Sequence, residues 1–470
     1  MSRRVRWVRS LALASVCAAS SAAAAEPRMR KGPYLQDLAP TSITVMWQLD
    51  APAPAKLTVI GPGGEGTDSR DRAIPRERSI DVAAANIAEA RIDRLVPSSR
   101  YRYRVEVGGK AWAGEFATAP PIGKAVPYSF IVAGDSRYGL EPHRRIVERI
   151  VQEVPDFVLG TGDMVDDGSR QDQWQQFFDI EQRLLRDYVY FPAVGNHDRQ
   201  GRGRTADTYR AYFSVPENGG DTERYYAFTY ADTRFLVLDS NIYSFALVDQ
   251  TSWLERELIA ARQDAAIHHI FVVMHHPPFS ISLHGGARDL RERWTPLFAK
   301  YQVSAVFSGH DHVYSRAEHD GVRYFVSGGG GAPLYPLRPH SHPIDVAAVK
   351  KFERVYHYLR VNVSGQRVEV TGVRTDGTQI ETTTWKEGPP PPPPAAPKPP
   401  KSPGAKPGVP AVGAPAVAVA APVAGLGAGG SGPGGEGPGG EGGVPLLWFG
   451  IGGVGLLLGA AVVVVRTLRR

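Results

Sequence analysis

Four short apolar runs in the middle of the chain each end in an aspartate or a histidine. They read YSFIVAGD from Tyr128, DFVLGTGD from Asp156, HIFVVMHHPP from His269 and SAVFSGHDH from Ser304. Stretches with helical spacing lie between them, such as EPHRRIVERIVQEV and TSWLERELIAARQ. Strands that alternate with helices predict an α/β domain. Because ligands gather beyond the carboxyl ends of such strands, the terminal side chains are expected to share one site.

Five motifs at or beyond strand ends carry the side chains that would build this site. They are GDSRYG with Asp135, GTGDMVDDG with Asp163, VGNHDR with Asn196 and His197, VVMHHPPF with His275, and GHDH with His310 and His312. Residues two apart in an extended segment point to the same side, which makes the last two histidines a natural pair of metal ligands. A mixed set of Asp, Asn and His suits Zn, Fe or Mn better than calcium. The five motifs together predict a metal centre.

The block from Lys31 to Ala119 follows a different pattern. Its runs SITVMWQL, AKLTVIG, YRYRVEV and AWAGEFATAP alternate apolar and polar residues, as half-buried strands do. Short strands separated by turn-forming residues predict an all-β sandwich over 31–119. Trp47 and the phrase LVPSSRYRYRV resemble a fibronectin type III-like domain, and PIGKAVP reads as the linker to the α/β domain.

The first 25 residues have the layout of a signal peptide. A basic start is followed by a short apolar stretch and by three alanines, so cleavage is expected after Ala25. An uncleaved anchor is the alternative. The pair Arg3-Arg4 resembles a twin-arginine signal, so the sequence leaves open whether export follows the Sec or the twin-arginine (Tat) route. Cys17 is the sole cysteine and lies in this segment, so the mature chain would use neither disulfides nor thiol chemistry.

The last part of the chain predicts a tether. Residues 387–445 are rich in Pro, Gly and Ala and are expected to be a disordered linker. The stretch 446–465 carries no charge and is about long enough to span a bilayer, with a buried core helix as the alternative. The basic RTLRR that follows is expected on the cytoplasmic side. The folded part would then lie outside, as an exported periplasmic or cell-surface protein with a single membrane anchor.

The charge balance argues against a nucleic-acid partner. The formal net charge of +6 falls to −1 once the four arginines of the first segment and the three of the last are set aside. A folded part that is near neutral has no basic surface bias, so no nucleic acid is expected to bind. The oligomeric state is left open by the sequence.

The motif order GD, GD, GNH, VxxH and GHxH resembles the calcineurin-like metallophosphoesterases. With a β-domain in front, the chain is similar to the purple acid phosphatase branch from about Lys31 to Thr384. The resemblance implies an αββα domain of two sheets over 127–384 and a centre with two metal ions, of Fe, Zn or Mn. It implies that Asp163 bridges the two ions, and it divides the other ligands between a first ion (Asp135 and His312) and a second ion (Asn196, His275 and His310). It also implies that His197 and His284 contact the substrate, although His284 reads equally as an exposed loop residue.

Two positions depart from the family pattern. Many relatives carry D-x-H at the first motif, where this chain has Arg137. The purple enzymes carry a tyrosine ligand three residues after the bridging aspartate, where this chain has Asp166. Asp166 or water is therefore expected to complete the first ion's ligands. Arg137 stays protonated and cannot bind a metal, so it would contact a phosphate oxygen or pair with Asp166 or Asp167.

The sequence thus predicts hydrolysis of phosphate monoesters, as in acid phosphatases. A phosphodiesterase or nucleotidase on the same site is the nearest alternative, because the motifs do not separate these substrates. A catalytically weak binding protein at the cell surface is the alternative from another class. The core ligands are all retained, which favours the enzyme. His276 is interpreted as a packing residue and not as a ligand. The glycine-rich VSGGGGAPLY loop is interpreted either as a structural turn or as backbone that approaches the substrate.

Overall fold

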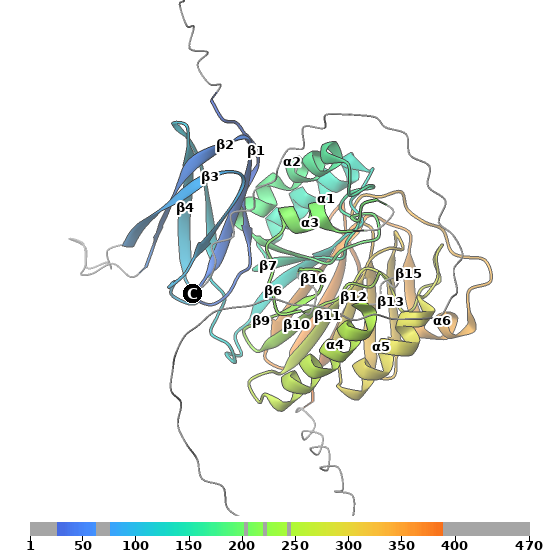
Figure 1. The fold of residues 1–470 in the computed structure, drawn as a ribbon. Coiled ribbons are helices and arrows are strands. Elements are labelled where there is room, and N and C mark those ends of the chain that lie inside the picture. Colours follow the sequence, from blue (N-terminus) through green and yellow to red (C-terminus); the bar gives the residue numbers. More distant parts are fainter. Residues whose placement is uncertain (1–25, 63–75, 202–204, 220–222, 242–245, 389–470) are drawn as a thin grey trace, which may run out of the picture. The chain divides into compact units, whose positions relative to one another are not determined.

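The structure is a computed structural model that describes residues 26–62, 76–201, 205–219, 223–241 and 246–388 (Figure 1). The predicted signal peptide, the Pro-rich linker and the predicted membrane helix at 446–465 lie outside these residues. Within the described residues, every helix is too short or too polar to cross a membrane.

The N-terminal region is rich in sheet, which is consistent with a fibronectin type III-like domain. Its strands are β1 Met29–Gln36, β2 Ile43–Gly61, β3 Arg76–Ile92, β4 Arg100–Val107 and β5 Lys110–Ala117. β2 pairs with β3 along its length, while β1 and β4 pair with successive halves of β2. The sequence motifs SITVMWQL and AKLTVIG were expected to form separate strands. They form one strand instead, because β2 continues through register shifts between Gln48 and Ala55.

The α/β domain contains two sheets. Each includes further strands beside those that were predicted from the sequence. The first has the order β18-β17-β16-β6-β7-β8 and the second has the order β15-β13-β14-β12-β11-β10-β9. The strands of the first sheet are β6 Tyr128–Ala133, β7 Phe157–Gly160, β8 Val189–Pro192, β16 His357–Ser364, β17 Arg367–Arg374 and β18 Gln379–Lys386. The strands of the second are β9 Tyr226–Tyr230, β10 Thr233–Val237, β11 His269–Val273, β12 Ala305–Ser308, β13 Tyr314–His319, β14 Val322–Ser327 and β15 Val349–Glu353.

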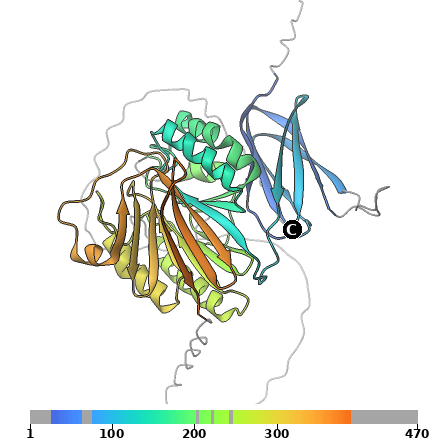
Figure 2. The same ribbon diagram turned by 180° about the vertical axis from the view of Figure 1, so that it is seen from behind.

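Helices cover the outer face of each sheet (Figures 1 and 2). They are α1 Leu140–Glu153, α2 Gln171–Asp187, α3 Asp207–Tyr212, α4 Ala246–Gln263, α5 Arg288–Lys300 and α6 Pro343–Ala348. α1 buries positions spaced three and four apart, as an amphipathic helix does, and it ends at Glu153, with Val154 as its C-cap before Pro155. α1 and α2 share a core with β6 and β7, whereas α4 and α5 share one with β11 and β12. The domain is therefore layered αββα.

Aromatic side chains fill the space between the two sheets. The ring of Phe130 on β6 meets the rings of Phe235, Phe271 and Phe307 on the second sheet at centroid distances of 5.3–6.0 Å. Edge-to-face contacts of this kind add to the free energy gained from burial. This rigid interior fixes the positions of the strand ends above it.

The direction of the strands brings the predicted motifs together. β6, β7 and β8 run parallel in one sheet, and β10, β11 and β12 run parallel in the other. The two sheets are joined at the last residues of β6 and β14, where Ser327 Oγ donates to the Val132 carbonyl at 3.0 Å. Loops from both sheets therefore meet at the same edge of the domain.

Candidate metal centre

Three of the predicted ligands turn sharply away from the strands that carry them. Asp135, Asp163 and His310 have φ angles of 57°, 55° and 67°, in the left-handed region that non-glycine residues seldom adopt. Backbone hydrogen bonds hold them there; the amide of Asp135, for example, donates to the Gly162 carbonyl at 2.9 Å. Such backbone strain concentrates at functional sites. The three side chains are aimed by the turn, and not by strand geometry alone.

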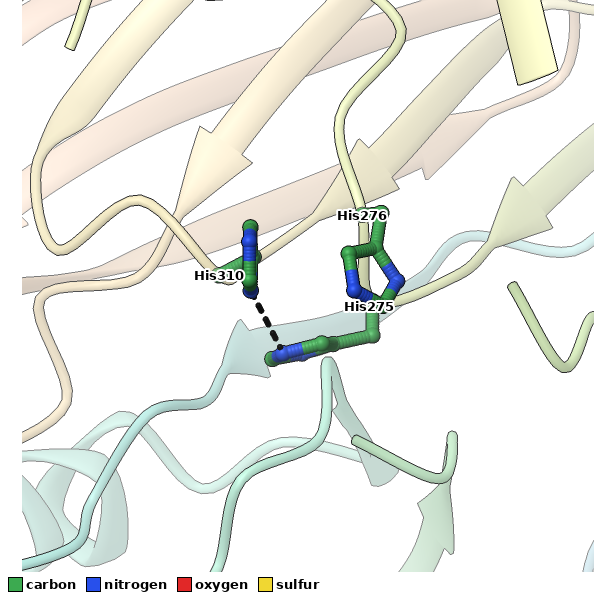
Figure 3. Close-up of side chains that lie close together, drawn as sticks. All are labelled: His275, His276 and His310. Atoms are coloured by element: carbon green, nitrogen blue, oxygen red, sulfur yellow. Dashed lines mark hydrogen bonds between the residues drawn. The ribbon is translucent and has the colours of Figure 1, made fainter. Parts of the chain in front are cut away.

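Four lone-pair atoms converge beyond the ends of β7, β8, β11 and β12. His275 Nε2 lies 3.0 Å from Asn196 Oδ1, 3.2 Å from His310 Nδ1 and 3.3 Å from Asp163 Oδ1. His310 Nδ1 lies 3.0 Å from Asn196 Oδ1. Figure 3 shows a nitrogen of the His310 ring directed at the His275 ring, with the two rings nearly perpendicular at 76°. Ligands on one zinc-like ion, with bonds of about 2.0–2.1 Å, lie about 3.3–3.4 Å apart, so these four atoms fit a shared cation.

The hydrogen bond on the far side of His275 fixes its tautomer. His275 Nδ1 lies 2.8 Å from the Thr161 carbonyl and must donate to it, which leaves Nε2 as a lone pair in the neutral ring. Burial disfavours the imidazolium, but the charge of Asp163 outweighs burial and raises the pKa of His275 to about 9. The field that favours a proton at this point also favours a metal cation.

The ligands predicted for a first ion surround an arginine. His312 Nδ1 donates to the Pro333 carbonyl at 2.7 Å, so Nε2 is the lone pair, and it lies 3.5 Å from Asp135 Oδ1. Arg137 Nη2 lies 3.4 Å from this His312 nitrogen. Arg137 also pairs with Asp163 Oδ2 at 3.3 Å and with Asp166 Oδ1 at 3.0 Å. Two roles were predicted for Arg137, a contact with a phosphate oxygen or a salt bridge with a nearby acid. In the structure it forms the salt bridge with Asp166.

The two predicted substrate histidines are each anchored through Nδ1. His197 donates to the Asp166 carbonyl at 2.7 Å, and its backbone amide donates to Asp163 Oδ1 at 3.0 Å. His284 Nδ1 lies 2.9 Å from Asp311 Oδ1, and its side chain is 40% exposed. The His284 ring lies 4.2 Å from the His310 ring, so it stands at the centre.

His276 packs against the centre, and one of its ring nitrogens lies close enough to those of His275 and His310 to share a metal ion with them. Its Nδ1 lies 2.8 Å from the Ser240 hydroxyl and its ring lies 4.3 Å from that of His310. Burial, followed by the charge of His275, lowers the pKa of His276 to about 3. A ring that stays neutral supports its neighbours without adding charge.

Three further residues shape the centre and were not singled out from the sequence. Asp198 accepts hydrogen bonds from the backbone amides of Asp163, Met164 and Gly195 at 2.8–2.9 Å and so joins two ligand loops. Asp311 orients His284, and the ring of Tyr335 stacks on His312 at 3.9 Å. The signal for the first two was their place inside GNHDR and GHDH, whereas Tyr335 was marked only as the last residue of the glycine-rich VSGGGGAPLY loop.

The glycine-rich loop that contains Tyr335 has a structural role. The amide of Gly330 donates to the Gly134 carbonyl at 2.9 Å, and a Cβ on Gly330 would lie 2.1 Å from that oxygen. Only glycine allows this close approach between two backbones. The loop is thus held against the segment that carries Asp135.

A small pocket opens beside Arg137. It has a volume of roughly 140 Å³ and lies between the Asp135 loop, the Asp163 loop and the helices α1 and α2. Its lining combines polar and apolar side chains, among them Arg137, Asp166, Leu140, Met164, Gln173 and Phe177.

Two facing sheets whose strand ends gather Asp, Asn and His side chains define the metallophosphoesterase class of fold and site. Residues 128–314 match the family model described as "Calcineurin-like phosphoesterase", so the chain carries a calcineurin-like phosphoesterase domain. The resemblance predicted from the five motifs is confirmed.

Purple acid phosphatases are among the relatives of this chain. Purple acid phosphatase of Glycine max is 25% identical over 323 residues, which cover 63% of this chain and 68% of the relative. Human tartrate-resistant acid phosphatase type 5 is 26% identical over 280 residues, which cover 50% and 81%. Uncharacterized protein Rv2577 of Mycobacterium tuberculosis is 33% identical over 192 residues, and the match spans only 36% of that relative's length and 36% of this chain.

Solved structures show the same fold. The purple acid phosphatase PPD1 from yellow lupin seeds has a TM-score of 0.61 at 17% identity and covers 77% of this chain and 74% of its own. The structure of PhoD has a TM-score of 0.56 at 14% identity and covers 75% and 89%.

Proposed function

We propose that the chain hydrolyses phosphate esters, with a preference for monoesters, at a metal centre on the carboxyl ends of its strands. The observation that carries this proposal is the convergence of Asp163, Asn196, His275 and His310 at 3.0–3.3 Å. Relatives named purple acid phosphatase and phosphoenolpyruvate phosphatase support the same chemistry. Fe, Zn and Mn suit this ligand set.

The metal, when bound, polarises a phosphoryl oxygen and lowers the pKa of water. The side chains around it orient the substrate and move protons. His284, with Nδ1 bonded to Asp311, would bind a phosphoryl oxygen or protonate the leaving oxygen through Nε2. His197 would approach the same group from the Asp163 side, because its amide is bonded to that carboxylate. The pocket beside Arg137 would receive part of the alcohol.

The relatives imply a dinuclear centre. Among the described residues, Asn196, His275 and His310 are well placed to bind the second of the two ions. The described residues do not fit the first ion, because the guanidinium of Arg137 lies among Asp163, Asp166 and His312. The proposed hydrolysis therefore does not depend on a metal ion at the predicted first site.

The test uses p-nitrophenyl phosphate and its bis ester. Protein stripped with EDTA is assayed before and after addition of Mn²⁺, Zn²⁺ or Fe²⁺. We expect metal-dependent turnover, faster on the monoester, and its loss in His275→Ala. The matched control is His340→Asn, an exposed histidine whose φ of 58° suits asparagine.

The outcomes separate the three candidate functions. Faster turnover of the bis ester would favour a phosphodiesterase. Metal binding without turnover of either ester would favour a binding protein at the cell surface. Equal turnover in wild type and His275→Ala would refute the proposed centre.

Export and anchoring are also part of the proposal. The apolar segment 446–465 and the basic residues after it motivate a periplasmic or cell-surface location. Protease added to spheroplasts, from which the outer envelope has been removed, should release the folded part from the membrane. A folded part that resists protease in spheroplasts until they are lysed would contradict this location.

A further inference from the structure

The side chain of Arg137 lies among Asp163, Asp166 and His312, where the ligands of a first ion were predicted. Its Nε faces Asp163 Oδ2 at 3.3 Å, its Nη1 faces Asp166 Oδ1 at 3.0 Å and its Nη2 faces His312 Nε2 at 3.4 Å. These partners come from two loops, the one between β7 and α2 and the one between β12 and β13. Within the described part of the chain, Asp163 Oδ2 and Arg137 Nε make no hydrogen bond, so their ion pair is the main contact of each.

Arg137 is held firmly in this position. Its side chain is only 9% exposed, and it donates a hydrogen bond to the Tyr335 hydroxyl oxygen. The ring of Tyr335 also stacks on His312, so the guanidinium lies beside two rings that hold each other in place. The neighbouring Gly139 lies against the Gly331 backbone, where a Cβ would come within 1.7 Å of the Gly331 carbonyl oxygen. The segment that carries Arg137 therefore has little room to swing away.

The charge of Arg137 matters as much as its position. A guanidinium stays protonated, donates through five N–H groups and offers no lone pair to a metal. It supplies one fixed positive charge next to the carboxylates of Asp163 and Asp166. A metal ion placed among the same carboxylates would meet this like charge at short distance. The cluster of His275, His310 and Asn196 differs, because it presents lone-pair atoms to a common point.

We propose that the guanidinium of Arg137 takes the place of the first metal ion, so that this centre binds a single metal ion beside a built-in organic cation. The ion is held by Asp163, Asn196, His275 and His310. The inference rests on the proposed metal centre but not on its hydrolytic activity. Arg137 then screens Asp163 permanently and presents its remaining N–H groups to an anionic substrate.

The test is the number of metal ions bound per chain. Protein is saturated with Mn²⁺, desalted and analysed by elemental mass spectrometry. We expect one ion in wild type and two in Arg137→His, which restores the D-x-H pattern. Mn²⁺ electron paramagnetic resonance should show an isolated ion in wild type and a spin-coupled pair in the variant. Arg170→His, which changes an exposed arginine paired with Asp172, should stay at one.

Each outcome decides the proposal. Two ions in wild type would overturn it, and so would one ion in a folded Arg137→His. Should Arg137→His not fold, Arg137→Ala serves in its place, and it should gain a second, weaker Mn²⁺ site by titration. No ion bound by wild type would refute the metal centre itself. One ion without hydrolysis would leave this inference standing while refuting the proposed function.

Discussion

Asp163 faces both halves of the centre with different oxygens. Oδ1 lies near His275 and accepts the His197 amide, while Oδ2 faces Arg137. Burial opposes its ionisation, but the charges of His275, His197 and Arg137 outweigh burial and lower the pKa of Asp163. One carboxylate thus holds a metal ligand, a substrate histidine and a guanidinium together.

Asp163→Asn should abolish most activity without unfolding the domain. Asparagine tolerates the left-handed φ of 55° and keeps an oxygen in place, but it removes the charge that binds the metal. We expect kcat to fall by more than about 100-fold, the upper range for partners of metal ligands, with an unchanged circular dichroism spectrum. Activity within a few-fold of wild type would show that the Asp163 charge does not serve the centre.

Asp311 should act only through His284. Asp311→Asn weakens the hydrogen bond that orients the imidazole, so kcat should fall about 10–100-fold while metal content stays constant. His284→Ala should give a similar loss, and the double variant should lose no more, because the two residues work as one unit. Losses that multiply in the double variant, or a loss of bound metal, would assign Asp311 another role.

At the scale of elements, short apolar runs were the reliable signal. They predicted β6, β7, β11 and β12, and helical spacing predicted α1 and α4. The stretch DAPAPA within β2 reads as a turn, yet the strand continues through it by shifting register against β3. The strands after Ser308 were not predicted individually. Their pairing depends on partners far away in the sequence, such as β16 with β6.

β1 meets the helices of the α/β domain through a buried lysine. Lys31 Nζ hydrogen-bonds to Gln48 of β2 and to the Tyr212 hydroxyl of α3, and lies 4.5 Å from the centroid of the Tyr212 ring. The residue is only 5% exposed. Burial, followed by the charge of Arg30, lowers the pKa of Lys31 to about 8.

Lys31 should make stability rise with pH. The unfolded chain keeps the proton up to a pKa of about 10.4, while the native state releases it near 8, so the free energy of unfolding should increase between these values. Lys31→Met should flatten this rise, as measured by urea unfolding at pH 7, 8.5 and 9.5. Lys110→Met, at an exposed position of the same sheet, should keep it. Parallel profiles for wild type and Lys31→Met would exclude this linkage.

At the scale of the whole molecule, the sequence predicted which side chains gather at one edge better than it predicted their surroundings. The closeness of Asp135, Asp163, His275 and His310 was predictable because each lies just beyond a strand, and strand ends converge in this class of fold. The sequence left two roles open for Arg137, contact with a phosphate or a salt bridge with a nearby acid. Its position depends on how three loops pack together, which the sequence does not show. The stacking of Tyr335 on His312 joins residues whose contact no local pattern encodes.

A chain ended after Gly388 should be soluble and as active as the full chain, whereas a cut after Thr384 should be less stable. β18 continues to Lys386, and Trp385 is buried with Arg323 4.4 Å from its ring. Loss of a buried tryptophan costs about 3 kcal/mol at the low end of the usual range. Thermal unfolding of both truncated forms measures the difference. Equal melting temperatures would show that the end of β18 contributes nothing.

The order of the first sheet also has a consequence for biosynthesis. β6 leads directly to Asp135, and its partner on one side is β16, which is translated long after it. A nascent chain that has emerged only as far as β15 holds β6 and β7 with an apolar edge unpaired, and such edges recruit other chains. The centre therefore completes late, after nearly the whole domain has been made. A chain that ends before β16 is therefore expected to aggregate rather than to form a partial enzyme.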